Sequence, residues 1–140
     1  MCVLHINFET DQLDLILEST KLPIYQVYRK GEKHKHKKDV IFDTNLISCI
    51  VSIKDWSDFE GQVQDMINFI RQYHIDLQAI KDSIKDVKWQ IDLPYSCRLN
   101  DEIFNQNDFL SPDLLFESGR LGIGINLALY HESPMGENLH

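Results

Sequence analysis

An apolar stripe with helical spacing runs through residues 57–84 and sets the strongest constraint on the fold. Its members recur every three or four residues and are Phe59, Val63, Met66, Ile67, Ile70, Leu77, Ile80 and Ile84. Ser57 and Glu60 have the spacing of a capping box, which predicts that the helix starts with Ser57 as its N-cap. Residues 74–76 indicate either a kink or a fresh helix start. A helix with one apolar face must bury it, so we expect it to lie on a sheet.

Five other segments have patterns typical of β-strands. They are residues 4–8, 24–28, 46–53, 87–93 and 123–130. The first and fourth alternate apolar with polar side chains, and Pro94 is expected to stop the fourth. The last strand carries its aliphatic side chains on one face, which predicts antiparallel pairing with that face buried.

Two shorter helices complete the pattern. Asp11 is expected to cap the first, which follows the first strand. Ser111 and Pro112 predict the start of the second, because Ser is a favoured N-cap and Pro fits the first helical turn. Gly122 is expected to end that helix as its C-terminal cap.

The order of these elements, β-α-β-β-α-β-α-β, predicts an α+β fold with a mostly antiparallel sheet of about five strands and helices packed on one face. We expect a single domain over residues 1–131 and a flexible tail over residues 132–140. No segment has the run of about 18 apolar residues that a membrane span needs. Residues 1–14 show no signal-peptide pattern, so a cytoplasmic location is expected.

No residue pattern predicts an active site or a cofactor. Cys2, Cys49 and Cys97 are odd in number and form no CxxC pair, which argues against a disulfide framework and a structural zinc site. His34 and His36 could face the same way, but the lysines around them disfavour a metal ion. Motifs such as GxSxG and HExxH do not occur. We therefore expect no catalytic activity, no cofactor and no metal.

Charge is distributed unevenly along the chain. The formal net charge is -8, yet residues 29–38 hold six of the 14 basic residues. Elsewhere eight basic residues face 21 acidic ones. Such a surface repels nucleic acid and anionic lipid and attracts basic proteins. We expect a protein partner, no nucleic acid, no membrane, and a monomer or weak homodimer.

Two sets of charged residues are candidate contacts. Carboxylates can take the place of phosphates at the Lys and Arg residues of a basic cleft. The acidic residues expected at the interface are Asp55, Asp58, Glu60, Asp65, Asp92, Asp101, Glu102, Asp108, Asp113 and Glu117. A solvated face with helix capping is the alternative for this set. The basic segment predicts a hairpin tip that either lies away from the acidic interface or makes a second contact. That contact would use Arg29, Lys30, Lys33, Lys35 and Lys37.

Three stretches together carry a family resemblance. They are "VYRKGE" at 27–32, "DMINFIRQYHIDLQAI" at 65–80 and "SPDLLFESGRLGIGINLALY" at 111–130. The pattern resembles small bacterial proteins of a domain of unknown function, in which a strand ending in Lys-Gly precedes a long helix and a closing apolar strand with a Leu-Gly pair. The Lys/His-rich insert at residues 33–38 is not part of that pattern.

Small acidic proteins of this kind are also similar to the immunity proteins of bacterial toxin systems, including contact-dependent growth inhibition. That resemblance implies an immunity protein that binds and neutralises a cognate toxin domain, often a nuclease with a basic cleft, without chemistry of its own. The alternative is a small-ligand-binding or regulatory domain without catalysis. A deep pocket would favour this alternative, whereas a flat acidic surface would favour toxin binding.

Overall fold

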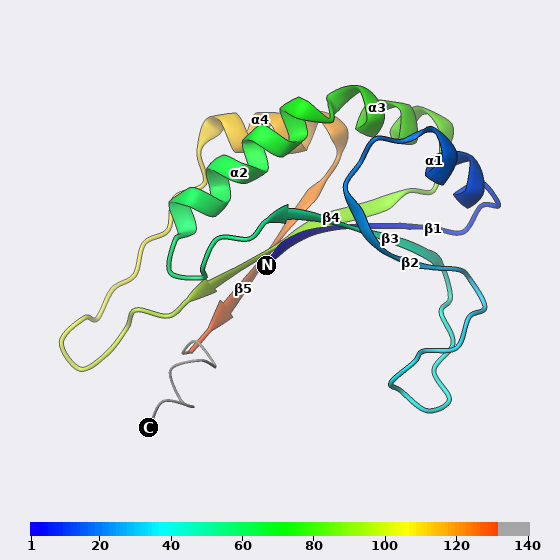
Figure 1. Cartoon of the computed structure of the whole chain (residues 1–140). Coiled ribbons are helices and arrows are strands. Elements are labelled where there is room, and N and C mark those ends of the chain that lie inside the picture. Colours follow the sequence, from blue (N-terminus) through cyan, green and yellow to red (C-terminus); the bar gives the residue numbers. More distant parts are fainter. Residues whose placement is uncertain (132–140) are drawn as a thin grey trace.

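The computed structural model describes residues 1–131, and the expected tail at residues 132–140 lies outside the described residues. The chain forms an α+β fold in which helices cover one face of a five-stranded sheet (Figure 1). The elements are β1 Cys2–Phe8, α1 Leu13–Ser19, β2 Ile24–Tyr28, β3 Asn45–Ser52, α2 Phe59–Gln72, α3 His74–Ser83, β4 Lys88–Ser96, α4 Pro112–Leu121 and β5 Gly124–Tyr130. No helix among the described residues is long and apolar enough to cross a membrane.

The sheet has the strand order β2-β3-β1-β4-β5. The first three pairings are antiparallel and the β4–β5 pairing is parallel. The sequence-based expectation of an antiparallel last strand is therefore wrong. The chain leaves β4, runs back along the sheet as α4 and then enters β5, and a helical crossover of this kind returns the chain in the same direction.

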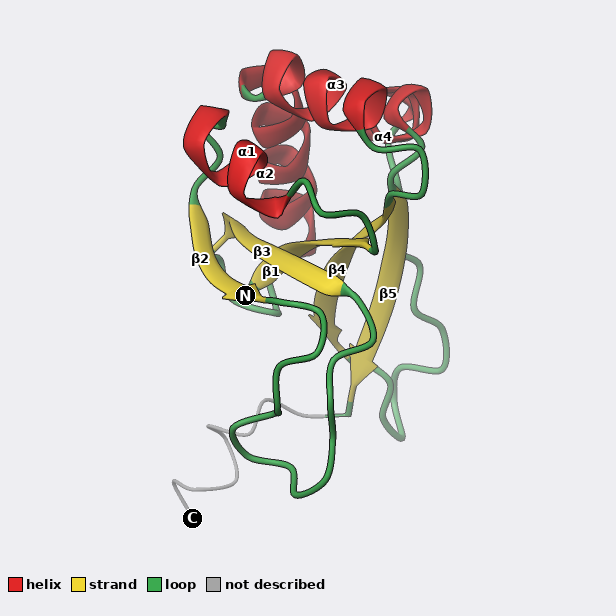
Figure 2. Ribbon diagram, turned by 90° about the vertical axis from the view of Figure 1, so that its right-hand side faces the viewer, coloured by secondary structure: helices red, strands yellow, loops and turns green. Residues whose placement is uncertain are grey.

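The core lies between the sheet and the helices. On the covered face, Leu4 of β1 lies between Cys49 of β3 and Ile91 of β4. Met66 and Ile70 of α2 are fully buried in the same cluster. Burying side chains of this size contributes roughly 1.5–3 kcal/mol each, so the α2–sheet contact is a principal source of stability. Within residues 1–131, the other face of the sheet has no helix on it (Figure 2).

The long helical stripe is divided in two. α2 ends at Gln72, and α3 begins at His74 after Tyr73, whose backbone is non-helical with a φ of -104° and a ψ of 20°. The backbone N–H of Tyr73 still donates to the carbonyl of Phe69, so the junction bends without losing its hydrogen bond. The sequence indicates a kink or a new start at residues 74–76, and the structure has a new helix starting at His74 without a side-chain cap.

Two expected N-caps are wrong. Ser57 does not cap α2: Asp58 is the N-cap, and one of its carboxylate oxygens accepts a 3.0 Å hydrogen bond from the backbone N–H of Gly61. The hydroxyl of Ser57 instead donates to Asp55. Asp11 does not cap α1, which starts after Gln12 without a side-chain cap. At α2 the capping residue is thus one position later than expected, whereas α1 has no side-chain cap at all.

The caps of α4 match the expectation. The hydroxyl of Ser111 accepts a hydrogen bond from the backbone N–H of Leu114, and Pro112 occupies the first turn. Gly122 ends the helix in the left-handed region with a φ of 71°, a conformation that glycine adopts without steric cost. These caps fix both ends of the crossover that places β5.

Candidate functional site

The loop at residues 97–111, between β4 and α4, projects from one end of the sheet and carries several candidate contact residues (Figure 1). Its neck is closed by polar contacts. The guanidinium of Arg98 lies 2.7 Å from a carboxylate oxygen of Asp108. The side chain of Gln106 accepts from the backbone N–H of Arg98 and donates to the carbonyl of Ser96 and to Asp108. These bonds give a long loop a defined shape.

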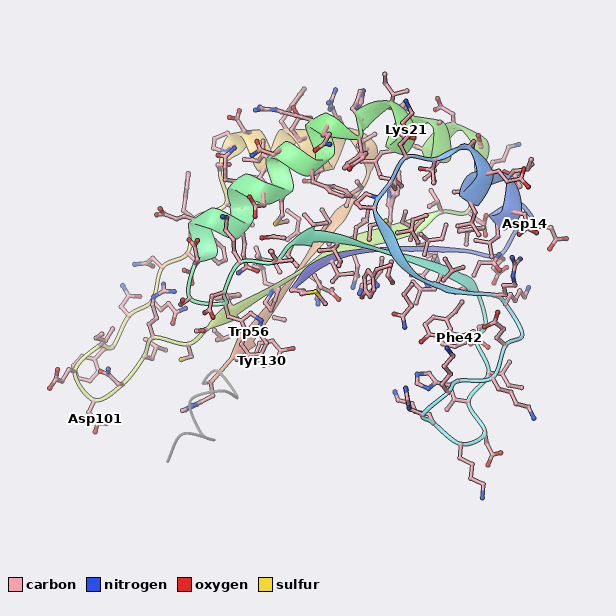
Figure 3. All side chains as sticks on the ribbon, viewed as in Figure 1. Asp14, Lys21, Phe42, Trp56, Asp101 and Tyr130 are labelled. Carbon is pink, nitrogen blue, oxygen red and sulfur yellow. The ribbon has the colours of Figure 1, made fainter. Side chains whose placement is uncertain are left out.

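The tip of this loop combines acidic and apolar side chains. The side-chain oxygen of Asn100 accepts hydrogen bonds from the backbone N–H groups of Glu102 and Ile103, which forms a tight turn. Asp101, labelled in Figure 3, and Glu102 therefore point outward at the end of the loop. Beside them Phe104 is 85% exposed. An exposed aromatic next to two carboxylates is an arrangement suited to insertion into a partner.

A cleft of about 530 Å³ separates this loop from the start of α2. Phe59, Val63 and Ile67 of α2 form its apolar wall, and Phe109 of the loop, 75% exposed, faces the same space. The rim is polar. The cleft is lined by Ser57, Asp58, Phe59, Glu60, Val63, Gln64, Ile67, Arg98, Asn107, Asp108, Phe109 and Ser111. It thus joins an apolar surface to a polar edge that includes three acidic residues and Arg98.

The structure brings some of the predicted acidic residues together at this cleft. Asp58, Glu60 and Asp108 line it. Asp55 lies in the turn just before α2, where hydrogen bonds from the backbone and hydroxyl of Ser57 lower the pKa of its carboxyl. With the two acids of the loop tip, these residues place negative charge at one end of the molecule.

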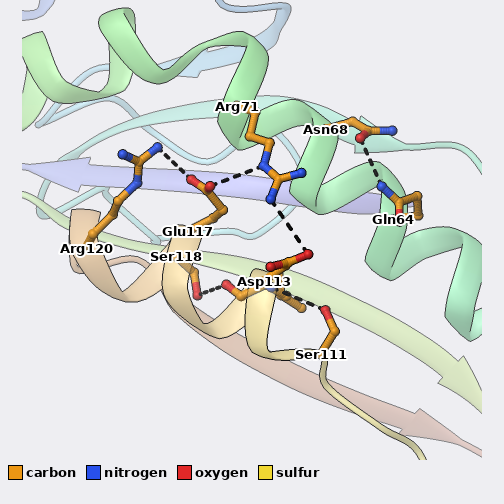
Figure 4. Close-up of polar contacts among 9 residues, drawn as sticks. Gln64, Asn68, Arg71, Ser111, Asp113, Glu117, Ser118 and Arg120 are labelled. Carbon is orange, nitrogen blue, oxygen red and sulfur yellow. Dashed lines mark hydrogen bonds and ion pairs between the residues drawn. The ribbon is translucent and has the colours of Figure 1, made fainter.

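Other predicted acidic residues are used within the fold. A carboxylate oxygen of Asp65 accepts a 2.7 Å hydrogen bond from the hydroxyl of Ser52, which ties α2 to β3. Arg71 of α2 reaches Asp113 at 3.8 Å and Glu117 at 3.2 Å on α4 (Figure 4). Burial raises the pKa of Glu117, but its bonds to Arg71 and Arg120 outweigh burial and leave the pKa below its usual value. Asp65 and Glu117 therefore hold elements together. The side chain of Asp113 stays largely exposed beside Arg71.

Asp92 lies on the uncovered face of the sheet. Its carboxylate is 3.0 Å from the Nε2 atom of His5, whose Nδ1 atom is 2.9 Å from the hydroxyl of Ser48. The three side chains come from β4, β1 and β3, so they form a line across three strands. The side chain of Ser48 is fully buried, so its hydroxyl is out of reach of a substrate. The line links neighbouring strands.

The basic segment extends the β2–β3 hairpin at the end of the sheet opposite the acidic loop (Figure 1). An isolated bridge joins Lys33 to Ile41, and the ring of His34 stacks on Phe42 at 5.5 Å. Arg29 forms a 2.7 Å ion pair with Asp14, and this pair lowers the pKa of the Asp14 carboxyl.

The other predicted basic contacts follow the same hairpin. The backbone N–H of Lys30 donates to the side chain of Asn45, and Lys35 and Lys37 lie in the exposed tip. The hairpin tip is confirmed, and it does not adjoin the cleft. No group of three or more His, Cys, Asp or Glu residues within residues 1–131 could hold a metal ion.

Sequence reasoning missed the apolar members of the site. The sequence predicts no helix or strand between Pro94 and Ser111, and Ile103, Phe104 and Phe109 stand exposed in this segment. The available signal was their lack of any helical or strand period, because apolar residues outside a periodic element have no core face to occupy. No family model, curated protein or solved structure matches this chain.

Proposed function

We propose that this protein is an immunity protein that binds and neutralises a bacterial toxin domain with a basic cleft, most simply a nuclease. The observation that carries the proposal is the closed loop at residues 97–111, which presents Asp101 and Glu102 next to Phe104. The carboxylates match Lys and Arg residues that normally hold phosphates, and the aromatic ring supplies an apolar anchor. The net charge of -8 favours the encounter.

The shape of the loop supports this function physically. Ordering a flexible loop on binding costs free energy, so a loop already held in place binds more tightly for the same contacts. The Arg98–Asp108 pair and the Gln106 bonds hold the neck, and the Asn100 turn holds the tip. The acidic start of α2 lies across the cleft and adds a second row of carboxylates to the same end of the molecule.

The test is co-expression with the product of the neighbouring gene, followed by purification of the complex and a growth assay. We expect a stable complex and restored growth. Exchanging Asp101 and Glu102 for Lys, or Phe104 for Ser, should abolish both. The matched controls are Glu18→Lys and Ile75→Ser, which change exposed residues on α1 and α3. Absence of a toxic partner, or rescue by the loop variants equal to that by the native protein, would contradict the proposal.

The association rate should also depend on salt. Steering between opposite charges weakens as ionic strength shortens the Debye length from about 30 Å at 0.01 M to about 8 Å at 0.15 M. We expect the rate to fall across this range, and to fall less for the Asp101 and Glu102 double variant. A rate that is indifferent to salt would remove the electrostatic part of the proposal.

A second function, binding of a small ligand, is favoured by the size of the cleft. Its volume of about 530 Å³ lies within the range of roughly 300–1,000 Å³ that is usual for ligand pockets. The apolar wall of α2 and the polar rim are also typical of such sites. Val63→Trp would fill the cleft. If this variant and the loop-tip variants all lose toxin rescue, the result favours the protein interface over ligand binding.

A further inference from the structure

β5 forms one of the two edges of the sheet, and its outer side is exposed. It ends the sheet, and its outer side has no strand beside it within residues 1–131. Leu127 is 47% exposed and Leu129 is 54% exposed, although both side chains lie on the face of the sheet that the helices cover elsewhere. The strand has the sequence "GINLALY" and carries no charge and no proline. Long, apolar and unprotected edges of this kind pair readily with another strand.

The strand at the opposite edge, β2, has features that block pairing with another strand, and β5 lacks them. β2 spans five residues, follows Pro23, and has a register shift between Ile24 and Gln26 in its pairing with β3. β5 pairs with β4 in one unbroken register along all seven of its residues. Irregularity, a short span and proline are the usual means of blocking edge pairing, so their absence from β5 marks that edge as an interaction surface.

The helix above this edge adds apolar surface. α4 lies over β5 at the same end of the helical layer (Figure 2). Its Leu114 and Leu121 are buried, whereas Leu115 and Phe116 on its other side are exposed. The guanidinium of Arg120 lies over the ring of Phe116 at 5.5 Å, and it leaves that ring 64% exposed. Strand and helix together present apolar groups on one flank.

The net charge of the protein and the lack of charge on β5 bear on which partner can bind to the surface formed by β5 and α4. A molecule with a net charge of -8 repels its own copies at most orientations. β5 is an uncharged strand, so two copies that meet there bring no like charges opposite one another. A basic toxin would instead be steered to the acidic loop. Self-pairing through β5 therefore avoids the like-charge repulsion that the net charge imposes on other parts of the surface.

We propose that two copies of this protein pair through β5 about a two-fold axis that passes close to Leu127. A two-fold axis perpendicular to the strands makes the paired strands antiparallel, and it places the same patch of each copy in contact. Leu127 then lies opposite Leu127 of the second copy, and Ile125 lies opposite Leu129 of the second copy. The sheet continues across both molecules. Because the loop at residues 97–111 follows the end of β4 beside Tyr130, the two loops lie at opposite ends of the interface and stay free.

Light scattering of the purified native chain over a range of concentrations tests the proposal. We expect the mass of a dimer, and a fall to half that mass for Leu127→Lys and Leu129→Lys. Ile75→Lys is the matched control, since Ile75 is 83% exposed on α3 and the charge change is the same. Circular dichroism establishes that each variant is folded. A native chain that stays monomeric, or a dimer that persists in both β5 variants, would overturn the proposal.

Disulfide trapping tests the position of the axis. In a Cys97→Ser background, Leu127→Cys should form a covalent dimer under mild oxidation, because opposed residues of an antiparallel pair lie within the distance that a disulfide spans. Ile75→Cys should not. If Ile75→Cys cross-links as fast as Leu127→Cys, or if a dimer forms without any Leu127→Cys cross-link, the proposed pairing is wrong.

Discussion

The side-chain amide of Gln62 donates a 2.7 Å hydrogen bond to the backbone carbonyl of Pro94. Gln62 is fully buried on α2 and Pro94 lies in β4, so the bond joins the helical layer to the sheet in the interior of the protein. The carbonyl of Pro94 has no strand to pair with on this side. Gln62 therefore satisfies a buried acceptor that the sheet leaves open.

We predict that Gln62→Ala lowers the free energy of unfolding by about 1–3 kcal/mol for the unpaired carbonyl, with a further loss from the cavity. Gln64→Ala is the control on the same helix, because Gln64 is exposed and its amide donates to Asn68 in the next turn. Its expected effect is within about 0.5 kcal/mol. Urea denaturation measures both. Equal effects of the two variants would show that the Gln62–Pro94 bond contributes little.

The same bond explains why Pro94 does not stop β4. The pairing of β4 with β1 ends at Asp92, which faces Val3, so beyond that point β4 has β5 alone as a neighbour. Proline is tolerated in a strand where its missing N–H would face no partner. The sequence shows the proline, but it does not show how far the neighbouring strand reaches. Strand existence was predictable here, and strand length was not.

The candidate site was predictable in its charges more than in its shape. The exposure of Asp101 and Glu102 was predictable because they lie between two periodic elements. The roles of Asp65 and Glu117 depend on Ser52 and Arg71, which come from other elements. Pairing between residues so far apart is a property of the packed layers, and no local pattern reports it.

The N-cap of α2 offers a direct comparison between two neighbouring residues. We predict that Asp58→Ala lowers the free energy of unfolding by about 1 kcal/mol, because it removes the acceptor for the N–H of Gly61. Ser57→Ala should change it by less than about 0.5 kcal/mol, since its hydroxyl bonds to Asp55 outside the helix. Thermal or urea denaturation measures the difference. The reverse order of effects would restore Ser57 as the cap.

Stability should depend on acid pH through Glu117. Because the pKa of Glu117 is lowered in the folded protein, the carboxylate contributes stability above its unfolded pKa of about 4.3, and this contribution is lost as pH falls through the folded value. Glu117→Gln should therefore be less stable than the native protein at neutral pH, and the difference should shrink in acid. Urea midpoints across this pH range test it, with Glu18→Gln as an exposed control. A difference independent of pH would contradict the role of the ion pairs with Arg71 and Arg120.

The three cysteines should differ sharply in reactivity. Burial raises the pKa of Cys2 and of Cys49 to about 12, so at neutral pH both are held as thiols, and the thiolate is the reactive form. Cys97, half-buried at the neck of the loop, is the accessible thiol. We predict that iodoacetamide adds a single adduct to the folded protein and three adducts in urea, as counted by mass spectrometry. Cys97→Ser should remove the adduct of the folded state. Rapid modification of Cys2 or Cys49 without denaturant would show that the β1–β3 core opens far more readily than its packing implies.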